Sequence, residues 1–190
     1  SLARLLDELA QWSRAYNLSA IRGREAMLTR HVLDSLSIHG DLVGSTIADV
    51  GTGAGFPGLP LAIANPERQF TLIDSNGKKV RFVRHAVHTL ALGNVAVMQA
   101  RAQDLHPEAP FDTIVARAFA PLPELLEQVV GLTGPRTRVL AMKGRNPAAE
   151  LSAVGPPWRI LAIRPLAIPG LDEERHLAVL GRPDPYPAAG

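Results

Sequence analysis

The N-terminal part of the chain carries apolar side chains at helical spacing. Between Leu2 and Tyr16 they recur every three or four residues, with charged side chains on the other face, and this pattern predicts an amphipathic helix. The same periodicity predicts a second helix at about Glu25–His39, with Asn17–Arg24 as the loop between the two. We therefore expect a helical extension over residues 1–44.

After Gly44 the pattern changes to short apolar runs that alternate with longer helical stretches, which is typical of βαβ units and a parallel sheet. The predicted strands are Thr46–Val50, Phe70–Ile73, Val95–Gln99, Thr113–Ala116 and Val139–Met142. The predicted helices between them are Leu59–Ile63, Lys78–Leu90 and Leu122–Val130. Two further runs, Ile160–Ile163 and His176–Leu180, would add strands at one sheet edge. The expected fold is α/β: a mostly parallel, seven-stranded sheet flanked by helices over residues 45–182, then a tail at 183–190.

Length and composition fit a single domain. The 190 residues are 46% hydrophobic, which is enough to fill a three-layer core. Charged residues make up 20%, and the apolar runs fall far short of the roughly 18 residues that span a bilayer. We expect a soluble, cytoplasmic, monomeric protein without a membrane segment. The net charge of +2 says little about partners.

The chain has no cysteine, which excludes disulfides, thiolate metal sites and cysteine nucleophiles. Histidines at 31, 85, 88 and 176 are scattered without metal-ligand spacing. We therefore expect no metal site.

A glycine-rich segment follows the first predicted strand. Gly51, Gly53, Gly55 and Gly58 lie between this strand and the next helix, where glycine allows positive-φ turns and close approach to a ligand at a helix N-terminus. Two ligand classes compete for this loop. The spacing from Gly53 to Gly58, with Asp74 21 residues after Gly53, matches the dinucleotide fingerprint.

The register that begins at Asp49 resembles motif I of class I methyltransferases. In that class, the acid two residues before the first glycine helps to hold the methionine part of S-adenosylmethionine, and the acid that ends strand two binds the ribose. Asp49 and Asp74 occupy both positions. Carboxylates suit a ligand with sulfonium and ammonium groups, whereas Asp49 would repel a pyrophosphate. We favour S-adenosylmethionine; the structural alternatives are that Asp49 caps a strand end and that Asp74 is a turn residue.

Basic residues gather at the predicted carboxyl edge of the sheet. The segment from Ser75 to Gln103 contains no acid but holds five cations, Lys78, Lys79, Arg81, Arg84 and Arg101. The first three lie in what should be the first turn of a helix, where the macrodipole disfavours positive charge. Contacts with the phosphates of a nucleic acid would explain them. The alternative is a solvated basic helix face.

The sequence also limits the reaction. Methylation at carbon five of a pyrimidine usually needs a cysteine, and radical methylation needs a cysteine-bound cluster. The Asn/Asp-Pro-Pro-aromatic motif of adenine amino-methyltransferases is absent after the fourth strand, where Ala116–Pro121 stands. Ring nitrogens and hydroxyls remain as acceptors. Guanine N7 has a lone pair and no proton to lose, so alignment alone would supply much of the catalysis.

Taken together, these segments resemble the bacterial small-subunit ribosomal RNA guanine-N7 methyltransferase family, also called glucose-inhibited division protein B. The matching segments are 31–35, 49–60, 72–82, 117–120, 142–144 and 174–176. The resemblance implies a Rossmann-like class I methyltransferase fold and methylation at N7 of a guanine in the 530 loop of 16S rRNA, guanine 527 in the usual numbering. The family's N-terminal helical segment is usually longer, so we expect this chain to begin inside it.

The resemblance also implies site residues. It places the cofactor at Gly51, Phe56, Ala102, Gln103 and Arg117, with Asp74 as a ribose ligand. Gln103 stands where the family pattern has glutamate, and Phe56 stands where it often has leucine. On the RNA side, our candidates are Lys143, Arg175 and His176, beside Lys78, Lys79 and Arg81. The expected partner is 16S rRNA or the small ribosomal subunit.

Two other functions fit the same residues. A catalytically silent module that binds RNA or senses S-adenosylmethionine would show the same site, because sequence shows a site and not a turnover. An NAD(P)-dependent oxidoreductase would share the glycine loop, but it explains Asp49 poorly and leaves little chain for a substrate domain.

Overall fold

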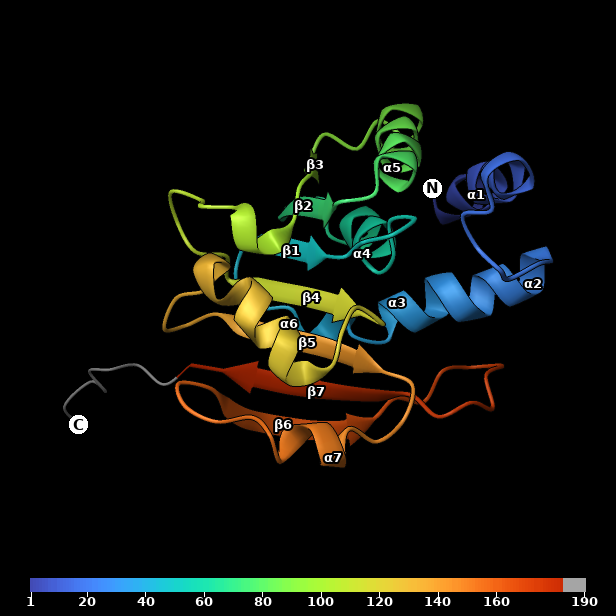
Figure 1. Ribbon diagram of the computed structural model, residues 1–190. Coiled ribbons are helices and arrows are strands. Elements are labelled where there is room, and N and C mark those ends of the chain that lie inside the picture. Colours follow the sequence, from blue (N-terminus) through green and yellow to red (C-terminus); the bar gives the residue numbers. More distant parts are fainter. Residues whose placement is uncertain (183–190) are drawn as a thin grey trace.

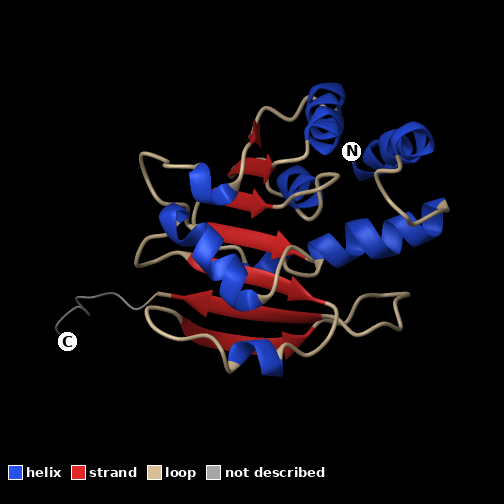
Figure 2. Ribbon diagram, in the orientation of Figure 1, coloured by secondary structure: helices blue, strands red, loops and turns tan. Residues whose placement is uncertain are grey.

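The computed structural model describes residues 1–182, and they form one seven-stranded sheet with helices on both faces (Figures 1 and 2). The strand order is β3-β2-β1-β4-β5-β7-β6. Strands β1 to β5 run parallel, and β7 pairs antiparallel with both β5 and β6. This confirms the predicted sheet and its two added edge strands. The predicted tail at 183–190 lies outside the described residues.

The strands form where the apolar runs predict them. Their bounds are β1 Thr46–Val50, β2 Gln69–Asp74, β3 Val95–Gln99, β4 Thr113–Arg117, β5 Arg138–Lys143, β6 Arg159–Pro165 and β7 His176–Gly181. Central strands are buried on both faces, as parallel strands covered by helices must be. The exposed strand β6 closes one edge.

Two apolar cores cover the two faces of the sheet. One lies under α1 (Leu2–Tyr16), α4 (Gly58–Ala64) and α5 (Gly77–Thr89). The other lies under α6 (Leu122–Val129), the 3-10 turn η4 (Val130–Leu132) and the short helix α7 (Ala148–Leu151). The periodic pattern predicted every one of these elements except η4 and α7. The segments of η4 and α7 are each too short to show a clear helical period.

The second N-terminal helix differs from the prediction. It consists of α2 (Arg24–Met27), a π-helical segment η1 (Leu28–Leu33) and α3 (Asp34–Leu36), followed by the 3-10 turn η2 (His39–Asp41). The predicted continuous helix to His39 is thus wrong at its C-terminal end. Wide π turns are often found at functional sites, and this one ends beside the carboxyl edge of the sheet (Figure 1).

All five parallel strands end at one edge of the sheet, on the right in Figure 1. The loop after β1, the turn after β2, the 3-10 turn η3 (Ala102–Asp104) after β3 and the loops after β4 and β5 therefore meet there. Open α/β sheets bind ligands at this edge. In the described part of the chain, no helix is long and apolar enough to cross a membrane.

Candidate cofactor and acceptor site

The glycine loop turns sharply out of β1. Gly51, Gly53 and Gly55 all have positive φ values, of 67°, 60° and 88°, a region that residues with a side chain rarely adopt. The backbone N–H groups of Gly51 and Thr52 both donate to the carbonyl of Ile73, at 2.9 and 3.0 Å. The loop is thereby fixed to the end of β2.

Asp49 organises this loop from inside. Its side chain has no exposed surface, and its Oδ2 accepts hydrogen bonds from Thr52 Oγ1 at 2.5 Å and from Gly58 N at 2.7 Å. A Cβ on Gly58 would lie 2.6 Å from the same oxygen, so glycine is required there. Burial raises the pKa of the Asp49 carboxyl to about 6, against the opposing effect of these two hydrogen bonds. Its predicted contact with the methionine part of a cofactor stays a prediction, and the observed contacts are those of a residue that shapes the loop.

Asp74, at the end of β2, connects the loop to the next helix. Its Oδ2 accepts from Gly53 N and its Oδ1 from Asn76 N, both at 2.8 Å. Asn76 in turn caps α5, because its side-chain oxygen accepts from the N–H groups of Lys78 and Lys79. Each carboxylate oxygen has two lone pairs, so this pairing leaves acceptor capacity for ligand hydroxyls.

A cavity of about 530 Å³ opens at this edge of the sheet. It brings together four of the predicted cofactor residues, Gly51, Asp74, Ala102 and Gln103, and also reaches Lys79. The ring of Phe119 packs against Gly51, where a Cβ would lie 2.0 Å from the ring. Next to Gly53, by contrast, space is open.

Several polar residues of this cavity were not assigned to a cofactor from the sequence, and three of them have side chains long enough to reach across it. Glu124 and Gln128 reach it from α6, where Gln128 Nε2 donates to Glu124 Oε1 at 3.0 Å. Arg101 reaches it from the loop after β3. The only sequence signal for the first two was a polar pair four residues apart on an otherwise amphipathic helix, which is also typical of a solvated face.

Phe56 and Arg117, predicted to contact the cofactor, do not line this cavity. Phe56 is buried, and the guanidinium carbon of Arg117 lies 5.6 Å from the centre of its ring. Arg117 instead lines a second cavity, of about 350 Å³, between η1 and the ends of β4 and β5. Ala118, which has a φ of 47°, lines both cavities. Of the predicted cofactor residues, Arg117 thus lines the adjoining second cavity, and Phe56 lines neither cavity.

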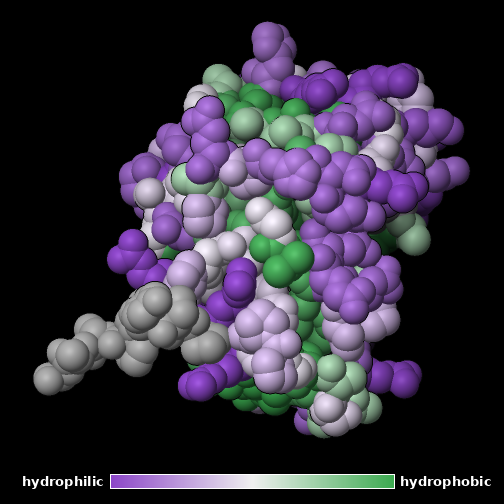
Figure 3. Space-filling view, turned by 60° about the vertical axis from the view of Figure 1, so that its left-hand side comes forward, coloured by the Kyte–Doolittle hydropathy of each residue, from purple (hydrophilic) through white to green (hydrophobic). Residues whose placement is uncertain are grey.

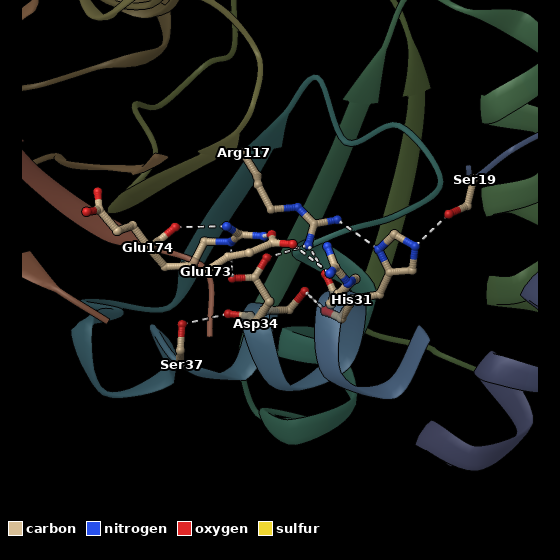
Figure 4. A network of polar contacts seen from close by, with 10 residues as sticks. Ser19, His31, Asp34, Ser37, Arg117, Glu173 and Glu174 are labelled. Atoms are coloured by element: carbon tan, nitrogen blue, oxygen red, sulfur yellow. Dashed lines mark hydrogen bonds and ion pairs between the residues drawn. The ribbon is translucent and has the colours of Figure 1, made fainter. Parts of the chain in front are cut away.

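Four cations and one carboxylate line the second cavity, with apolar residues between them. The residues are Ile21, Arg30, His31, Asp34, Arg117, Ala118, Met142, Lys143, Gly144 and Arg175. Arg117 Nη1 donates to Asp34 Oδ2 at 2.9 Å and to the Arg30 carbonyl at 3.1 Å (Figure 4). The other oxygen of Asp34 is buried without a hydrogen bond among the described residues, 3.7 Å from Arg175 Nε.

His31 belongs to the same network (Figure 4). Its Nε2 lies 2.8 Å from Ser19 Oγ and its Nδ1 lies 3.4 Å from Arg117 Nη2, while its ring stacks on Phe56. Burial, and then the charge of Arg117, lower the pKa of His31 to about 4. Because a guanidinium only donates, Nδ1 is the acceptor and the proton is on Nε2. His31 is therefore a neutral ring that fixes Arg117.

The predicted RNA-side residues are placed differently from one another. Lys143 is mostly buried: its Nζ donates to Glu150 Oε2 and to the Ala120 carbonyl, both at 2.8 Å. Arg175 pairs with Glu173 at 3.1 Å. Lys143 and Arg175 line the second cavity and His176 does not, and the role of all three toward RNA stays a prediction. Lys78 and Arg81 are exposed on α5, outside both cavities.

Over residues 1–182, no group of three or more histidine, aspartate or glutamate side chains could hold a metal ion. Asp34 and Arg117 of the second cavity instead pair with each other, and Glu124 and Gln128 of the first cavity do the same. What the site offers a ligand is therefore shape, charge and hydrogen bonds.

Comparisons with known proteins agree with this arrangement. The family described as rRNA small subunit methyltransferase G matches residues 1–178. The chain is 46% identical to Ribosomal RNA small subunit methyltransferase G of Xanthomonas campestris pv. campestris (strain 8004) over 179 residues, which cover 94% of this chain and 84% of that protein. It is 47% identical to the protein of the same name from Pseudomonas paraeruginosa over 176 residues, 92% of this chain and 82% of that one.

The fold also recurs in solved structures. TrmN from Thermus thermophilus superposes with a TM-score of 0.63 at 22% identity, over 90% of this chain and 53% of that one. The predicted Rossmann-like methyltransferase fold is thus confirmed. With the family match over nearly the whole chain and these close relatives, the protein belongs to the rRNA small subunit methyltransferase G family.

Proposed function

We propose that this protein transfers a methyl group from S-adenosylmethionine to N7 of a guanine in the 530 loop of 16S rRNA. The observation that carries the proposal is the junction at Ala118, where a cavity built on the glycine loop meets a cavity lined by cations. A methyl donor in the first and a nucleotide in the second would face each other there. The family relatives are named for methylation of ribosomal RNA.

The first cavity fits S-adenosylmethionine. Open space next to Gly53 and the carboxylate of Asp74 would receive the ribose, and the segment of Ala102 and Gln103 would cover the adenine. Glu124 adds a second carboxylate, which suits the positive charges of this ligand better than a pyrophosphate. When bound, the cofactor supplies an electrophilic methyl group on a sulfonium.

The second cavity fits the acceptor nucleotide. Arg30, Arg117, Lys143 and Arg175 give it positive charge beside the apolar Ile21 and Met142, a combination that suits a phosphate and a base. The N7 lone pair attacks without loss of a proton, so no general base is required. A neutral His31 is consistent with this, since its role is to hold Arg117 in place. Orientation of the two reactants is then the main contribution of the chain.

Arg117 is the residue that we assign to acceptor orientation. It is held by Asp34, the Arg30 carbonyl and His31 from one side, and it precedes Ala118 at the junction. Lys79 and the exposed Lys78 and Arg81 on α5 would contact neighbouring phosphates. We place the reaction in the cytoplasm, with a monomeric enzyme acting on 16S rRNA or the small subunit.

Two measurements test the proposal. Calorimetric titration with S-adenosylmethionine and with NADH separates a methyltransferase from an oxidoreductase: we expect heat from the first ligand alone. Incubation with radiolabelled S-adenosylmethionine and small subunits that lack this methylation then separates an enzyme from a silent module. Cofactor binding without label in 16S rRNA would reject the proposed reaction.

A further inference from the structure

Four arginines line a third cavity at the opposite edge of the sheet. Arg136, Arg138, Arg159 and Arg182 come from the turn before β5, the start of β5, the start of β6 and the end of β7, and the cavity measures about 390 Å³. No acid lines it. This edge is the amino end of the parallel strands, so the cavity is separate from both spaces described above.

The strand register explains why the cavity is open. Arg138 and Arg159 are both paired with Gly181 on β7, one from each side. A Cβ on Gly181 would lie 2.8 Å from Leu161 Cδ1 and 3.6 Å from Arg138 Nη1. Because Gly181 has no side chain, it leaves space between the two arginines, and the guanidinium of Arg138 extends over that space.

The four arginines have no acidic partner in the described part of the chain. Within residues 1–182, none of the four arginines forms a salt bridge, and Arg182 donates only a long hydrogen bond of 3.4 Å to Thr133 Oγ1. In the second cavity, by contrast, each cation has an acidic partner. Several like charges that share one cavity repel one another unless an anion joins them.

Apolar surface completes the wall. Leu161 is 45% exposed and Val43 is 39% exposed, and both line the cavity. Figure 3, in which this side of the molecule comes forward, shows hydrophilic residues beside a strip of apolar surface. Guanidinium groups next to apolar side chains suit phosphates flanked by sugars or bases, and arginine is the cation most used for phosphate.

We propose that this arginine cavity binds the phosphate backbone of the rRNA substrate at a second point, remote from the methylated base. The proposal rests on the proposed function for the identity of the RNA. Strand β5 connects the arginine cavity with the second cavity, which we assign to the acceptor nucleotide. Arg138, at the start of β5, lines the arginine cavity, and Lys143, at its end, lines the second cavity. At about 3.3 Å per residue the two ends lie roughly 17 Å apart. Only an RNA that spans this distance engages both.

The test uses the full chain and a fragment of 16S rRNA that contains the 530 loop. The double variant Arg136→Ser/Arg159→Ser changes the two exposed arginines of the cavity, and the matched control Arg4→Ser/Arg14→Ser changes two exposed arginines of α1. Affinity is measured by fluorescence anisotropy over a range of salt concentrations. Each lost phosphate contact should reduce the slope of log K against log salt by about 0.7 to 0.9.

We expect the cavity variant to bind the fragment about ten-fold more weakly, with a slope shallower by between one and two contacts. The control should match the parent protein, and Arg136→Lys/Arg159→Lys should restore most of the slope because it keeps the charge. S-adenosylmethionine affinity should be unchanged in all variants, which also shows that they fold. Equal affinity and slope in the cavity variant and the control would overturn the proposal.

The same variants distinguish failure of the second RNA contact from failure of the proposed methylation. Methyl transfer at saturating RNA should be the same in the cavity variant and the parent, because the cavity only positions the substrate. If the parent protein fails to methylate the fragment but the slope still falls in the cavity variant, the proposed reaction is wrong and the second RNA contact stands. If the parent protein methylates the fragment and the slope does not change in the cavity variant, the proposed reaction stands and the second RNA contact is wrong.

Discussion

The buried Asp49 makes a prediction that can be worked out in energies. Its pKa of about 6 lies above the ordinary value of 3.8 because burial disfavours the charged form. A raised pKa in the folded state contributes stability that is present below pH 4 and is lost as pH rises to about 6. A difference of about two pKa units corresponds to about 3 kcal/mol.

His31 works in the opposite direction over nearly the same range. Its pKa of about 4 lies below the ordinary value of 6.5, so the folded state disfavours its protonation. Stability from this ring is present above pH 6.5 and is lost as pH falls to about 4, again by about 3 kcal/mol. In the parent protein the two effects largely cancel, and neither is visible in its pH profile alone.

Substitution separates them. In Asp49→Asn, the amide oxygen keeps both hydrogen bonds, from Thr52 and Gly58. Any pH-independent change in the free energy of unfolding that the substitution causes cancels when the same variant is compared at two pH values. We expect its free energy of unfolding to increase by about 2 kcal/mol more than that of the parent between pH 4.5 and 7, since about a third of the full effect lies below pH 4.5. Urea unfolding at fixed m-value is the assay.

A matched control is Asp112→Asn. Hydrogen bonds from Ser45 and Thr46 outweigh burial and lower the pKa of Asp112, so its stabilisation is lost as pH falls. This variant should therefore change the pH profile with the opposite sign from Asp49→Asn and only below about pH 4, so between pH 4.5 and 7 its profile should run parallel to that of the parent. Parallel profiles for the parent and Asp49→Asn would refute the assignment of a raised pKa to Asp49.

Four further substitutions test individual contacts of the site. Arg117→Lys should lower methyl transfer at least ten-fold in single-turnover assays, because Arg117 lines the second cavity and its forked contacts are lost. Calorimetry should find S-adenosylmethionine affinity within about two-fold of the parent, and a large loss of cofactor affinity would contradict this. Gly51→Ala should lower cofactor affinity more than Gly53→Ala, since only the Cβ added at Gly51 meets an aromatic ring. Both variants should lose roughly 1 to 2 kcal/mol of stability in urea unfolding because of the positive φ. Equal cofactor affinities of the two variants would argue against the ring contact. Lys143→Met should destabilise the protein by about 1 to 3 kcal/mol, because the Ala120 carbonyl loses its lysine donor and Glu150 Oε2 keeps only the N–H of Leu122. Unchanged urea unfolding would show that the Lys143–Glu150 pair contributes nothing.

The sheet could be predicted because its signals are local. Each strand is an apolar run bounded by turn residues, and the glycines after β1 identify the ligand edge. The π-helical turns of η1 could not be predicted, since apolar positions recur closely enough for either kind of helix. As a result, the place of His31 and Asp34 beside Arg117 was not visible, although both belong to a segment that resembles the family.

The residues that line the first cavity could be predicted only in part from the sequence. Gly51, Asp74, Ala102 and Gln103 follow three neighbouring strands and meet at one cavity. Phe56 and Arg117 follow neighbouring strands too, but their side chains point away from that cavity and meet each other. Position in the sequence fixes the strand end at which a residue lies and not the side on which its side chain packs.

The arginine cavity depends on pairing between distant segments. Arg138 and Arg159 become neighbours only because Gly181 on the antiparallel β7 lies between them. Nothing in the local sequence gives this register, since it follows from the order in which β5, β7 and β6 join the sheet. The two edge strands were expected, and their pairing was not.

The most direct test of the central claim is the position of the transferred methyl group. After incubation of the protein and S-adenosylmethionine with small subunits that lack this methylation, 16S rRNA is reduced and treated with aniline, which cleaves the chain at 7-methylguanosine. New cleavage at one guanine of the 530 loop, dependent on both protein and cofactor, is the result that we predict. Methyl incorporation at another atom, or none in ribosomal RNA, would contradict the account.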